Sequence, residues 1–389
     1  LDSLPRQEPI HFLLALPDGV NIKYFKVSLP ADEPANELEL KFITNFVEAE
    51  VYNHLTTLGG ISLEVYVNLE ASWAQKIAEG LIETFGINTS RAERVGYARI
   101  TNVADRMQNA LYPPSSDGKL KKFEINIHSS DEFPGAPAPY QFQAPRTNVF
   151  ADVASGLEDR IICGLDVGGT DIKAAISVRG RLAGLKEYDW NPATFGRAEE
   201  LIDPVVAIAS LLRARVSLDE LPPNSERNAL AKVVEQAMRK DAELTDIENA
   251  VTQAEEVLAD SLIPLDAIGL CFPDVVVKNK VVGGEVPKTK GMRDNTAIDF
   301  EDQFSKITDI DERLMEVCRK DGAVMITNDG PMASFTAAVE LAASPDAHQI
   351  ADGVFAHTLG TDLGTGLVLG DGTIPEIPLE AYNMVVDLG

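Results

Sequence analysis

The sequence lacks several features that would assign it to a specialised class of protein. It has only three cysteines in 389 residues, Cys163, Cys271 and Cys318, with neither a CxxC spacing nor a disulfide-like framework. No apolar run approaches the roughly 20 residues of a membrane span. The first residues also lack the basic start and the cleavage site of a signal peptide. We therefore expect a cytoplasmic protein with reduced cysteines.

Basic residues are scarce as well. The chain has 34 lysines and arginines against 61 aspartates and glutamates, a formal net charge of −27. Such a surface repels phosphate backbones and anionic lipids, so we expect neither nucleic acid nor membrane as a partner. The remaining composition, 45% hydrophobic and 24% charged, is typical of a soluble globular protein, and the length predicts two or three domains.

The first 128 residues predict a mixed α/β domain. Three stretches alternate between apolar and polar residues, as strands with one buried face do: 25–29, 63–67 and 123–127. Apolar residues at helical spacing occupy 43–55 and 73–85, so we expect a small sheet backed by helices. His54 and His128 stand alone, and we interpret them as packed or solvated residues. The domain shows no catalytic pattern, which leaves a binding, regulatory or homo-oligomerising module as its predicted role.

A proline-rich stretch, residues 129–160, separates this domain from the rest of the chain. Its prolines, together with Gly135, favour extended polyproline conformations over a regular element. From residue 161 the apolar runs predict the element order βββαβαβα. We therefore expect a linker at 129–160, a first lobe at 161–348 and the start of a second, incomplete lobe at 349–389.

The richest stretch for chemistry is Ile161–Val178, which reads IICGLDVGGTDIKAAISV. An apolar run carries Asp166 near its end, turns through Gly168-Gly169-Thr170, and resumes as a second run that carries Lys173. Glycines let backbone N–H groups approach phosphate oxygens closely, and a carboxylate at a strand end can hold Mg²⁺ through its water shell. The pattern fits a phosphate-binding turn and an ordinary glycine hairpin equally well.

Two further stretches fit a nucleotide site. Asn328-Asp329 follows an apolar strand and precedes a helix of small residues, so Asp329 would face a cleft and accept a proton. The alternative is an Asn-Asp-Gly helix cap. Leu359–Gly366 (LGTDLGTG) joins two apolar strands and is either a tight β-turn or a second phosphate loop. The residues that would contact phosphate there are Gly360, Thr361, Gly364, Thr365 and Gly366.

Three sequences, GLDVGGTDIKAAI, TNDGPMASFTAAVE and TLGTDLGTGLVL, together resemble the ROK family of sugar kinases and sugar-responsive repressors. This family belongs to the sugar kinase–actin–Hsp70 (ASKHA) superfamily. The resemblance covers residues 161–389, so the N-terminal domain is additional to it. It implies an RNase H-like fold with two lobes, ATP and Mg²⁺ between them, and a small-molecule sugar as substrate.

The resemblance also implies roles for the motif residues. Asp166 would serve the Mg²⁺ ion and the phosphates, and the glycine turns at 168–170 and 360–366 would hold the phosphates. Asn328 would bind a sugar hydroxyl, and Asp329 would be the catalytic base. Lys173 is a further candidate for phosphate binding.

The sequence departs from the family pattern in three places. The usual Asn-Leu-Pro-Gly sugar loop is replaced by residues 286–292 (VPKTKGM). Two lysines there indicate a modified or anionic substrate, or simply a different loop, and Lys288 is the candidate contact. Asp362 stands where glycine is usual and would oppose a phosphate. The sugar-binding Glu and His of the family have only loose counterparts, Glu376 and Glu380.

We therefore predict an ATP- and Mg²⁺-dependent carbohydrate kinase with an additional N-terminal domain. The adenosine-binding segment should follow residue 389, so we expect the sequence to be part of a longer chain. One alternative is a non-catalytic sugar sensor or regulator of the same fold, and another is a superfamily ATPase that acts on protein partners. A DNA-binding repressor is disfavoured, because residues 1–128 contain no basic recognition helix.

Overall fold

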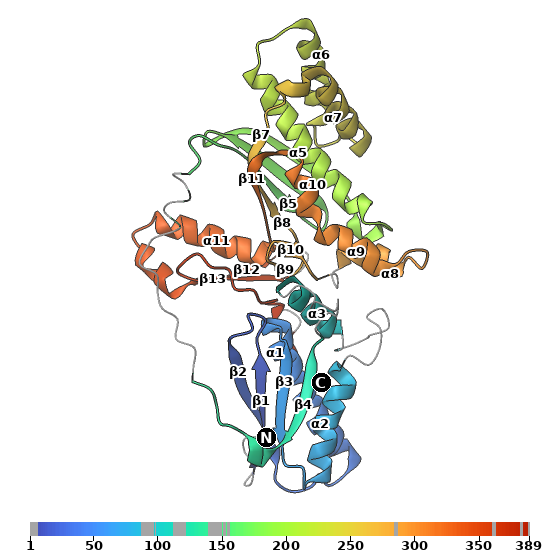
Figure 1. Cartoon of the computed structure of the whole chain (residues 1–389), viewed down its shortest axis with the longest axis vertical. Helices are drawn as coiled ribbons and strands as arrows, with labels where there is room; N and C mark the ends of the chain where they lie inside the picture. Colours follow the sequence, from blue (N-terminus) through green and yellow to red (C-terminus); the bar gives the residue numbers. More distant parts are fainter. Residues whose placement is uncertain are drawn as a thin grey trace. The chain divides into compact units, whose positions relative to one another are not determined.

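The computed structural model divides the chain into two compact units (Figure 1). Unit 1 comprises Leu1–Gln143 and Glu376–Gly389, and unit 2 comprises Ala144–Pro375. The residues that the structure describes are 7–86, 97, 99–111, 122–138, 150, 153, 156–283, 287–359, 363–381 and 384–387. Both units mix helices with strands, which confirms the predicted α/β class.

Unit 1 is built on a four-stranded sheet in the order β2-β1-β3-β4. β1 pairs antiparallel with β2 and β3, and β3 pairs in parallel with β4. The strands are β1 (Gln7–Ala15), β2 (Ile22–Pro30), β3 (Ser62–Val67) and β4 (Glu124–Ser129). The helices are α1 (Glu37–Leu58), α2 (Ser72–Phe85), α3 (Arg99–Leu111) and the short 3₁₀ helix η3 (Ser130–Glu132).

One face of this sheet forms the core of unit 1. Side chains alternate along a strand, so Ile10, Phe12 and Leu14 of β1 all point to the same side. They pack there with apolar residues of α1 and α2 in one buried cluster. The predicted strands and both predicted helices are present, whereas β1 and α3 were not predicted.

Unit 2 contains a five-stranded sheet in the order β11-β8-β5-β6-β7. The first three strands in sequence form an antiparallel meander, and β8 and β11 extend the sheet in parallel with β5. The strands are β5 (Ile161–Val167), β6 (Asp171–Val178), β7 (Arg181–Asp189), β8 (Leu265–Cys271) and β11 (Cys318–Thr327). This arrangement places the carboxyl ends of β5, β8 and β11 along one edge of the sheet.

Helices cover one face of this sheet. α5 (Glu199–Glu220) packs on β5, β6 and β7, and it is joined by α6 (Ser225–Ala237) and α7 (Leu244–Leu258). Their apolar residues share one buried cluster with the sheet. The opposite face is more open, because a Cβ atom added at Gly164 or Gly269 would meet no atom within 4 Å.

The remaining elements of unit 2 follow β7 and β8 and lead to a second, two-stranded sheet. Short elements are η4 (Pro192–Thr194), η5 (Ala259–Ser261), β9 (Val276–Val277), β10 (Lys280–Val281), η6 (Pro287–Thr289), α8 (Lys290–Asp294), α9 (Phe300–Thr308) and α10 (Ile310–Met315). After β11 come α11 (Asp329–Ala342), η7 (Ala347–Asp352), β12 (Val354–Leu359) and β13 (Leu363–Val368). β12 and β13 pair antiparallel, and α11 packs on both.

The division by contacts places residues 161–348 and 349–375, predicted as two lobes, in one unit. The sequence predicts that residues 349–389 belong together as the start of a second lobe. In the structure, the part from Glu376 onward groups with unit 1, because its described residues contact α1. The predicted linker at 129–160 contains the junction between the units at Gln143 and Ala144.

Candidate functional site

Unit 2 brings together the polar ends of three parallel strands. In the pairing register, Asp166 of β5 lies opposite Cys271 of β8, and Cys271 lies opposite Thr327 of β11. Neighbouring strands are about 4.8 Å apart, so Asp166 and Thr327 are separated by roughly two strand spacings. Asn328 and Asp329 follow directly. The register thus carries Asp166 and the Asn328-Asp329 pair to the same edge of the sheet.

Asp329 is half-buried at this edge in a mixed charge environment. Burial raises the pKa of its carboxyl group, and the charge of Asp166 raises it further. Lys288 and the backbone N–H of Gly330 lower the pKa of Asp329 but do not cancel the effect of burial. Lys288 belongs to η6, so this turn supplies a positive charge near the carboxylates. A carboxylate with a raised pKa is a better proton acceptor than an ordinary one at neutral pH.

Asn328 is the N-cap of α11. Its Oδ1 accepts a hydrogen bond from the N–H of Gly330 at 2.9 Å, and its Nδ2 donates to the carbonyl oxygen of Asp274 at 2.8 Å. The helix-cap alternative from the sequence therefore describes the Asn328 side chain. An amide retains a second N–H and a second lone pair, and these groups could reach a sugar hydroxyl. The role of Asn328 in substrate binding stays a prediction.

Glycines let the β12–β13 hairpin press closely on the start of α11. A Cβ on Gly330 would lie 2.2 Å from the carbonyl oxygen of Thr365, and one on Gly366 would lie 1.9 Å from the carbonyl oxygen of Gly330. A Cβ on Gly364 would lie 3.5 Å from Oδ1 of Asp329. The described part of the second glycine loop therefore borders the Asp329 carboxylate.

The turn between β5 and β6 is held by its own strand and by Trp190. The N–H of Gly168 donates to the carbonyl of Asp171 at 2.8 Å. The indole and backbone N–H groups of Trp190 donate to the carbonyls of Gly168 and Thr170, both at 3.0 Å. Among the residues that the structure describes, the N–H groups of Gly169 and Thr170 find no acceptor. Two such groups side by side are what a phosphate-binding turn offers.

Lys173 stands opposite Asp166 in the β5–β6 register. Its Nζ lies 2.6 Å from Oδ2 of Asp171, and this contact is the main reason that the pKa of Lys173 is raised. Asp166 and Glu187 raise the pKa of Lys173 further. Lys173 is exposed and already paired, so a phosphate group would have to compete with Asp171 for it.

A cluster of carboxylates lies beside this turn. Asp171, Glu187 and Asp189 place carboxylate oxygens within 4.8 Å of one another. Lys173 pairs with the first of them, and Nζ of Lys240 lies 2.8 Å from Glu187 and 3.4 Å from Asp189. Two ammonium groups thus compensate the cluster, and we assign no metal ion to it.

Among known proteins, the chain shows weak similarity to solved structures. No protein-family model matches the sequence, and no curated protein matches it. Among solved structures, a ROK hexokinase from Thermus thermophilus is similar at 17% identity and a TM-score of 0.26. The match covers 57% of this chain and 50% of the hexokinase chain, so the chain spans about half the length of that enzyme. A likeness at this TM-score supports no further argument.

Two neighbours of the predicted residues were not selected from the sequence. Cys271 is hydrogen-bonded to Asp166, and burial, with the charges of Asp166 and Asp329, raises the pKa of its thiol strongly. It therefore remains a neutral thiol. Asp274 is 3% exposed, and its Oδ1 accepts from the N–H of Val275 at 2.8 Å. Cys271 ends strand β8, so the strand-end rule that selected the carboxylates would have found it.

Some predicted residues are not part of this description. Gly360, Thr361 and Asp362 lie outside the described residues. Glu376 and Glu380 belong to unit 1. The roles assigned to these residues stay predictions.

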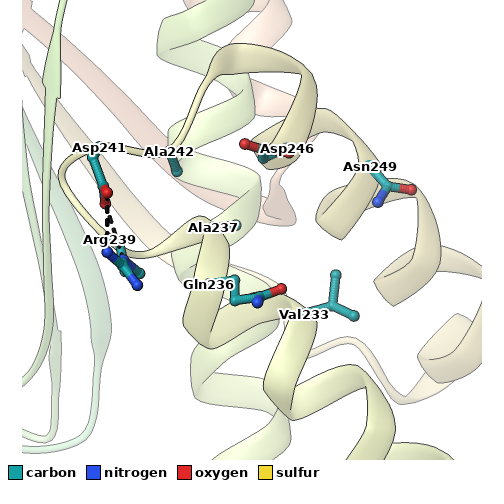
Figure 2. Close-up of a pocket in the computed structure, with 8 residues that line it drawn as sticks. All are labelled: Val233, Gln236, Ala237, Arg239, Asp241, Ala242, Asp246 and Asn249. Atoms are coloured by element: carbon teal, nitrogen blue, oxygen red, sulfur yellow. Dashed lines mark hydrogen bonds and ion pairs between the residues drawn. The ribbon is translucent and has the colours of Figure 1, made fainter.

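A pocket of about 280 Å³ lies elsewhere in unit 2, between α6 and α7 (Figure 2). Arg239 and Asp241 face each other there as an ion pair, with nitrogen–oxygen distances of 3.0 Å. The lining residues are Val233, Gln236, Ala237, Arg239, Asp241, Ala242, Asp246 and Asn249. None of the predicted site residues lines the pocket, and we assign it no ligand. Among the described helices of both units, none is long and apolar enough to cross a membrane.

Proposed function

We propose that unit 2 takes part in phosphorylating a hydroxyl group of a sugar or sugar derivative at the expense of ATP. The observation that carries this proposal is the environment of Asp329, a half-buried carboxylate of raised pKa near Asp166, Lys288 and Gly364. The strand order β11-β8-β5-β6-β7 supports the RNase H-like lobe that the sequence motifs imply. The resemblance of those motifs to ROK sugar kinases supports the substrate class.

The residues at this edge of the sheet fit ATP and Mg²⁺. Asp166 is an exposed carboxylate near a strand end, and Mg²⁺ binds to one or two carboxylates while it keeps several waters. The unpaired N–H groups of Gly169 and Thr170 would hold phosphate oxygens. Bound Mg²⁺ would neutralise part of the phosphate charge. The second glycine loop, of which Gly364–Gly366 are described, would approach the phosphates from the other hairpin.

Phosphoryl transfer to a sugar hydroxyl requires only a weak base from the protein. The sugar hydroxyl forms a bond with the γ-phosphorus while the bond to the β,γ-bridging oxygen breaks and ADP leaves. The hydroxyl proton passes to the Asp329 carboxylate. A weak base suffices, because phosphoryl transfer depends mainly on positioning and charge neutralisation. Lys288 offsets the negative charge that Asp166 and Asp329 bring to the site, which favours an anionic or phosphate-bearing reactant.

Replacing the proposed base tests this function in the full-length protein. Asp329→Asn should lower kcat for sugar-dependent ATP turnover about 100-fold or more, because general-base catalysis typically contributes 10²–10⁴-fold. Asp302→Asn is the matched control, since Asp302 lies in the first turn of α9 as Asp329 does in α11. Both substitutions remove one negative charge from a helix N-terminus. Full activity of the Asp329 variant would exclude it as the base.

Calorimetry distinguishes this function from its alternatives. A kinase should bind both sugar and ATP. Sugar binding without ATP binding would indicate the non-catalytic sensor, and ATP turnover that is independent of sugar would indicate an ATPase with another substrate. Either outcome would overturn the proposed kinase activity.

A further inference from the structure

Unit 1 contains a peptide segment bound along the C-terminal half of α1. The described residues of this segment are 376–381 and 384–387, and we call these two stretches the strap. The residues that it joins to the helix by side-chain hydrogen bonds are 324 and 332 positions apart in sequence. Its hydrogen bonds to Asn53, Thr56 and Thr57 all involve main-chain groups of the strap.

The strap supplies hydrogen-bond donors to the carbonyl groups at the C-terminal end of α1. The last four carbonyl groups of an α-helix have no partner within the helix. In α1, the carbonyl of Leu55 accepts from the N–H of Gly59 at 2.9 Å. The carbonyls of Thr56 and Thr57 accept from the N–H groups of Glu380 and Leu379, both at 3.0 Å. Two orphan carbonyls are therefore capped by the strap.

Thr56 and Gly59 adapt the helix end to this partner. The Thr56 hydroxyl is buried and donates to the carbonyl of Glu380 at 3.3 Å. Gly59 has a φ of +66°, and a Cβ there would lie 3.2 Å from Cδ of Pro378. Leu379 has a φ of +52°, an uncommon value for a residue with a side chain. Such a conformation persists where surrounding contacts hold it.

Asn53 holds the other end of the strap. Its Nδ2 donates to the carbonyl of Val385 at 2.9 Å, and its Oδ1 accepts from the N–H of Val385 at 2.7 Å. One side-chain amide thus binds both main-chain groups of one residue, as a paired residue of a neighbouring β-strand would. Val386, the next residue, is 93% exposed, so recognition at this end does not depend on its side chain.

We propose that the C-terminal half of α1 is a docking site for an extended peptide, that it recognises main-chain groups, and that its ligand is the strap of the same chain, bound reversibly. The chain passes between the units twice, once at Gln143 and once at Pro375. A docked strap anchors the second passage to unit 1. Release of the strap would remove this anchor between unit 1 and the segment that leaves unit 2.

Hydrogen exchange on the full chain tests the contacts. In the unsubstituted protein, the amides of Leu379, Glu380 and Val385 should be protected. Asn53→Ala should raise the exchange rate of the strap at least tenfold while the strands of unit 1 keep their protection. Asn126→Ala is the matched control, because Nδ2 of Asn126 donates to the Glu64 side chain at 3.0 Å and not to a described residue of the strap. Equal exchange of the strap in the Asn53 variant and the unsubstituted protein would overturn the proposal.

A peptide competition tests the docking site directly. Leu379→Pro with Val385→Pro removes two strap N–H donors and should release the strap. A fluorescent peptide EIPLEAYNMVVD, the sequence of residues 376–387, should then bind to this variant. It should not bind measurably to the unsubstituted protein, where the tethered strap acts at millimolar effective concentration. A peptide with both prolines is the negative control, and Asn53→Ala in the released variant should weaken binding at least tenfold.

Two results of the competition would overturn the proposal. The first is a failure of the peptide to bind a released variant whose Trp73 fluorescence shows that unit 1 is folded. The second is a dimer of the unsubstituted protein that the two prolines dissociate, because the strap would then dock between copies. Should the released variant fail to fold, the exchange experiment with Asn53→Ala decides alone.

Discussion

The two units contain similar sheets that carry different kinds of chemistry. Each sheet joins parallel strands to antiparallel ones. In unit 2, polar groups gather where the parallel strands end, at Asp166, Cys271 and Asp329. In unit 1, β3 and β4 instead place the rings of Tyr66 and His128 side by side, with centroids 4.9 Å apart. The carboxyl ends of the parallel strands thus carry the candidate catalytic groups in unit 2 and a stacked pair of rings in unit 1.

The two units also have separate cores. The buried cluster of unit 1 and that of unit 2 share no residue. The sequence contains two tryptophans, and each unit holds one of them, Trp73 in unit 1 and Trp190 in unit 2. Both are nearly buried, at 6% and 9% exposure, so their fluorescence should change on unfolding. Each unit thus has its own fluorescent reporter of unfolding.

The largest expected effect is a loss of stability in one unit when a leucine of its own core is truncated. Leu14 in unit 1 and Leu212 in unit 2 are both fully buried, at 0% exposure. Replacing either by alanine should lower the free energy of unfolding of its own unit by about 2–5 kcal/mol, because a cavity remains. Urea unfolding would be followed in a Trp190→Phe background for unit 1 and a Trp73→Phe background for unit 2.

The transition of the other unit serves as the control in each case. Leu14→Ala should leave the Trp190 transition unchanged, and Leu212→Ala should leave the Trp73 transition unchanged, because the two leucines belong to separate cores. Equal shifts of both transitions would show that the units unfold as one cooperative body. The comparison between two independent regions would then fail.

Much of the fold could be predicted from local periodicity. The strands at 25–29, 63–67 and 123–127 follow directly from alternation, and each is present. β1 could not be predicted because FLLAL is a continuous apolar run, which does not distinguish a strand from a buried helix segment. α3 escaped because several of its buried side chains are polar and obscure its apolar face. They include Asn102, Asp105, Arg106 and Gln108.

Less of the candidate site could be predicted, since its parts come together through register and long-range packing. The strand-end rule selected Asp166 and Asp329 and did find two residues at one edge of the sheet. It could not show that Lys288 would come close to them, because that depends on the path of η6. The strap was out of reach for the same reason. No periodicity links Val385 to Asn53 across 332 positions.

An effect of medium size is expected at two glycines, one in each unit, that lie close to neighbouring atoms. In unit 2, a Cβ on Gly366 would lie 1.9 Å from a backbone atom, the carbonyl oxygen of Gly330. In unit 1, a Cβ on Gly60 would lie 2.5 Å from the side-chain Cδ1 of Leu14, which can move. Gly366→Ala should therefore cost about 1–3 kcal/mol of the stability of unit 2, and Gly60→Ala should cost unit 1 less. Thermal unfolding with each tryptophan reporter measures both costs.

A third glycine calibrates these costs. Gly164 lies in a strand of unit 2, and a Cβ there would meet no atom within 4 Å. Gly164→Ala should leave stability unchanged or raise it by up to about 1 kcal/mol, because alanine restricts the unfolded chain. A loss at Gly164 as large as that at Gly366 would mean that close approach of the hairpin to α11 is not the cause.

The smallest expected effect gives the two units opposite pH dependences. Burial, with the charge of Lys23, lowers the pKa of His54 in unit 1, although the Glu50 carbonyl, 2.9 Å from Nδ1, opposes this. Folded unit 1 thus binds the proton less readily than the unfolded chain. Its contribution is fully present above pH 6.5, the unfolded value, and is lost as the pH falls below it. For Asp329 in unit 2 the folded pKa is raised, so its contribution is present at low pH and is lost as the pH rises through that value.

Urea midpoints at pH 7.5 and pH 5.5 should reveal this contrast. The Trp73 midpoint should fall at the lower pH, and His54→Phe should reduce the fall. The ring centroids of His54 and Phe25 lie 3.7 Å apart in a stacked arrangement, and phenylalanine keeps a ring there that does not titrate. Below pH 5.5, acidification toward 3.8, the ordinary pKa of Asp, should favour folded unit 2 through Asp329, and Asp329→Asn should remove that contribution from the Trp190 midpoint. A Trp73 midpoint that is the same at both pH values would show that burial of His54 does not oppose its protonation. The proposed difference between the units would then depend only on the groups at their strand ends.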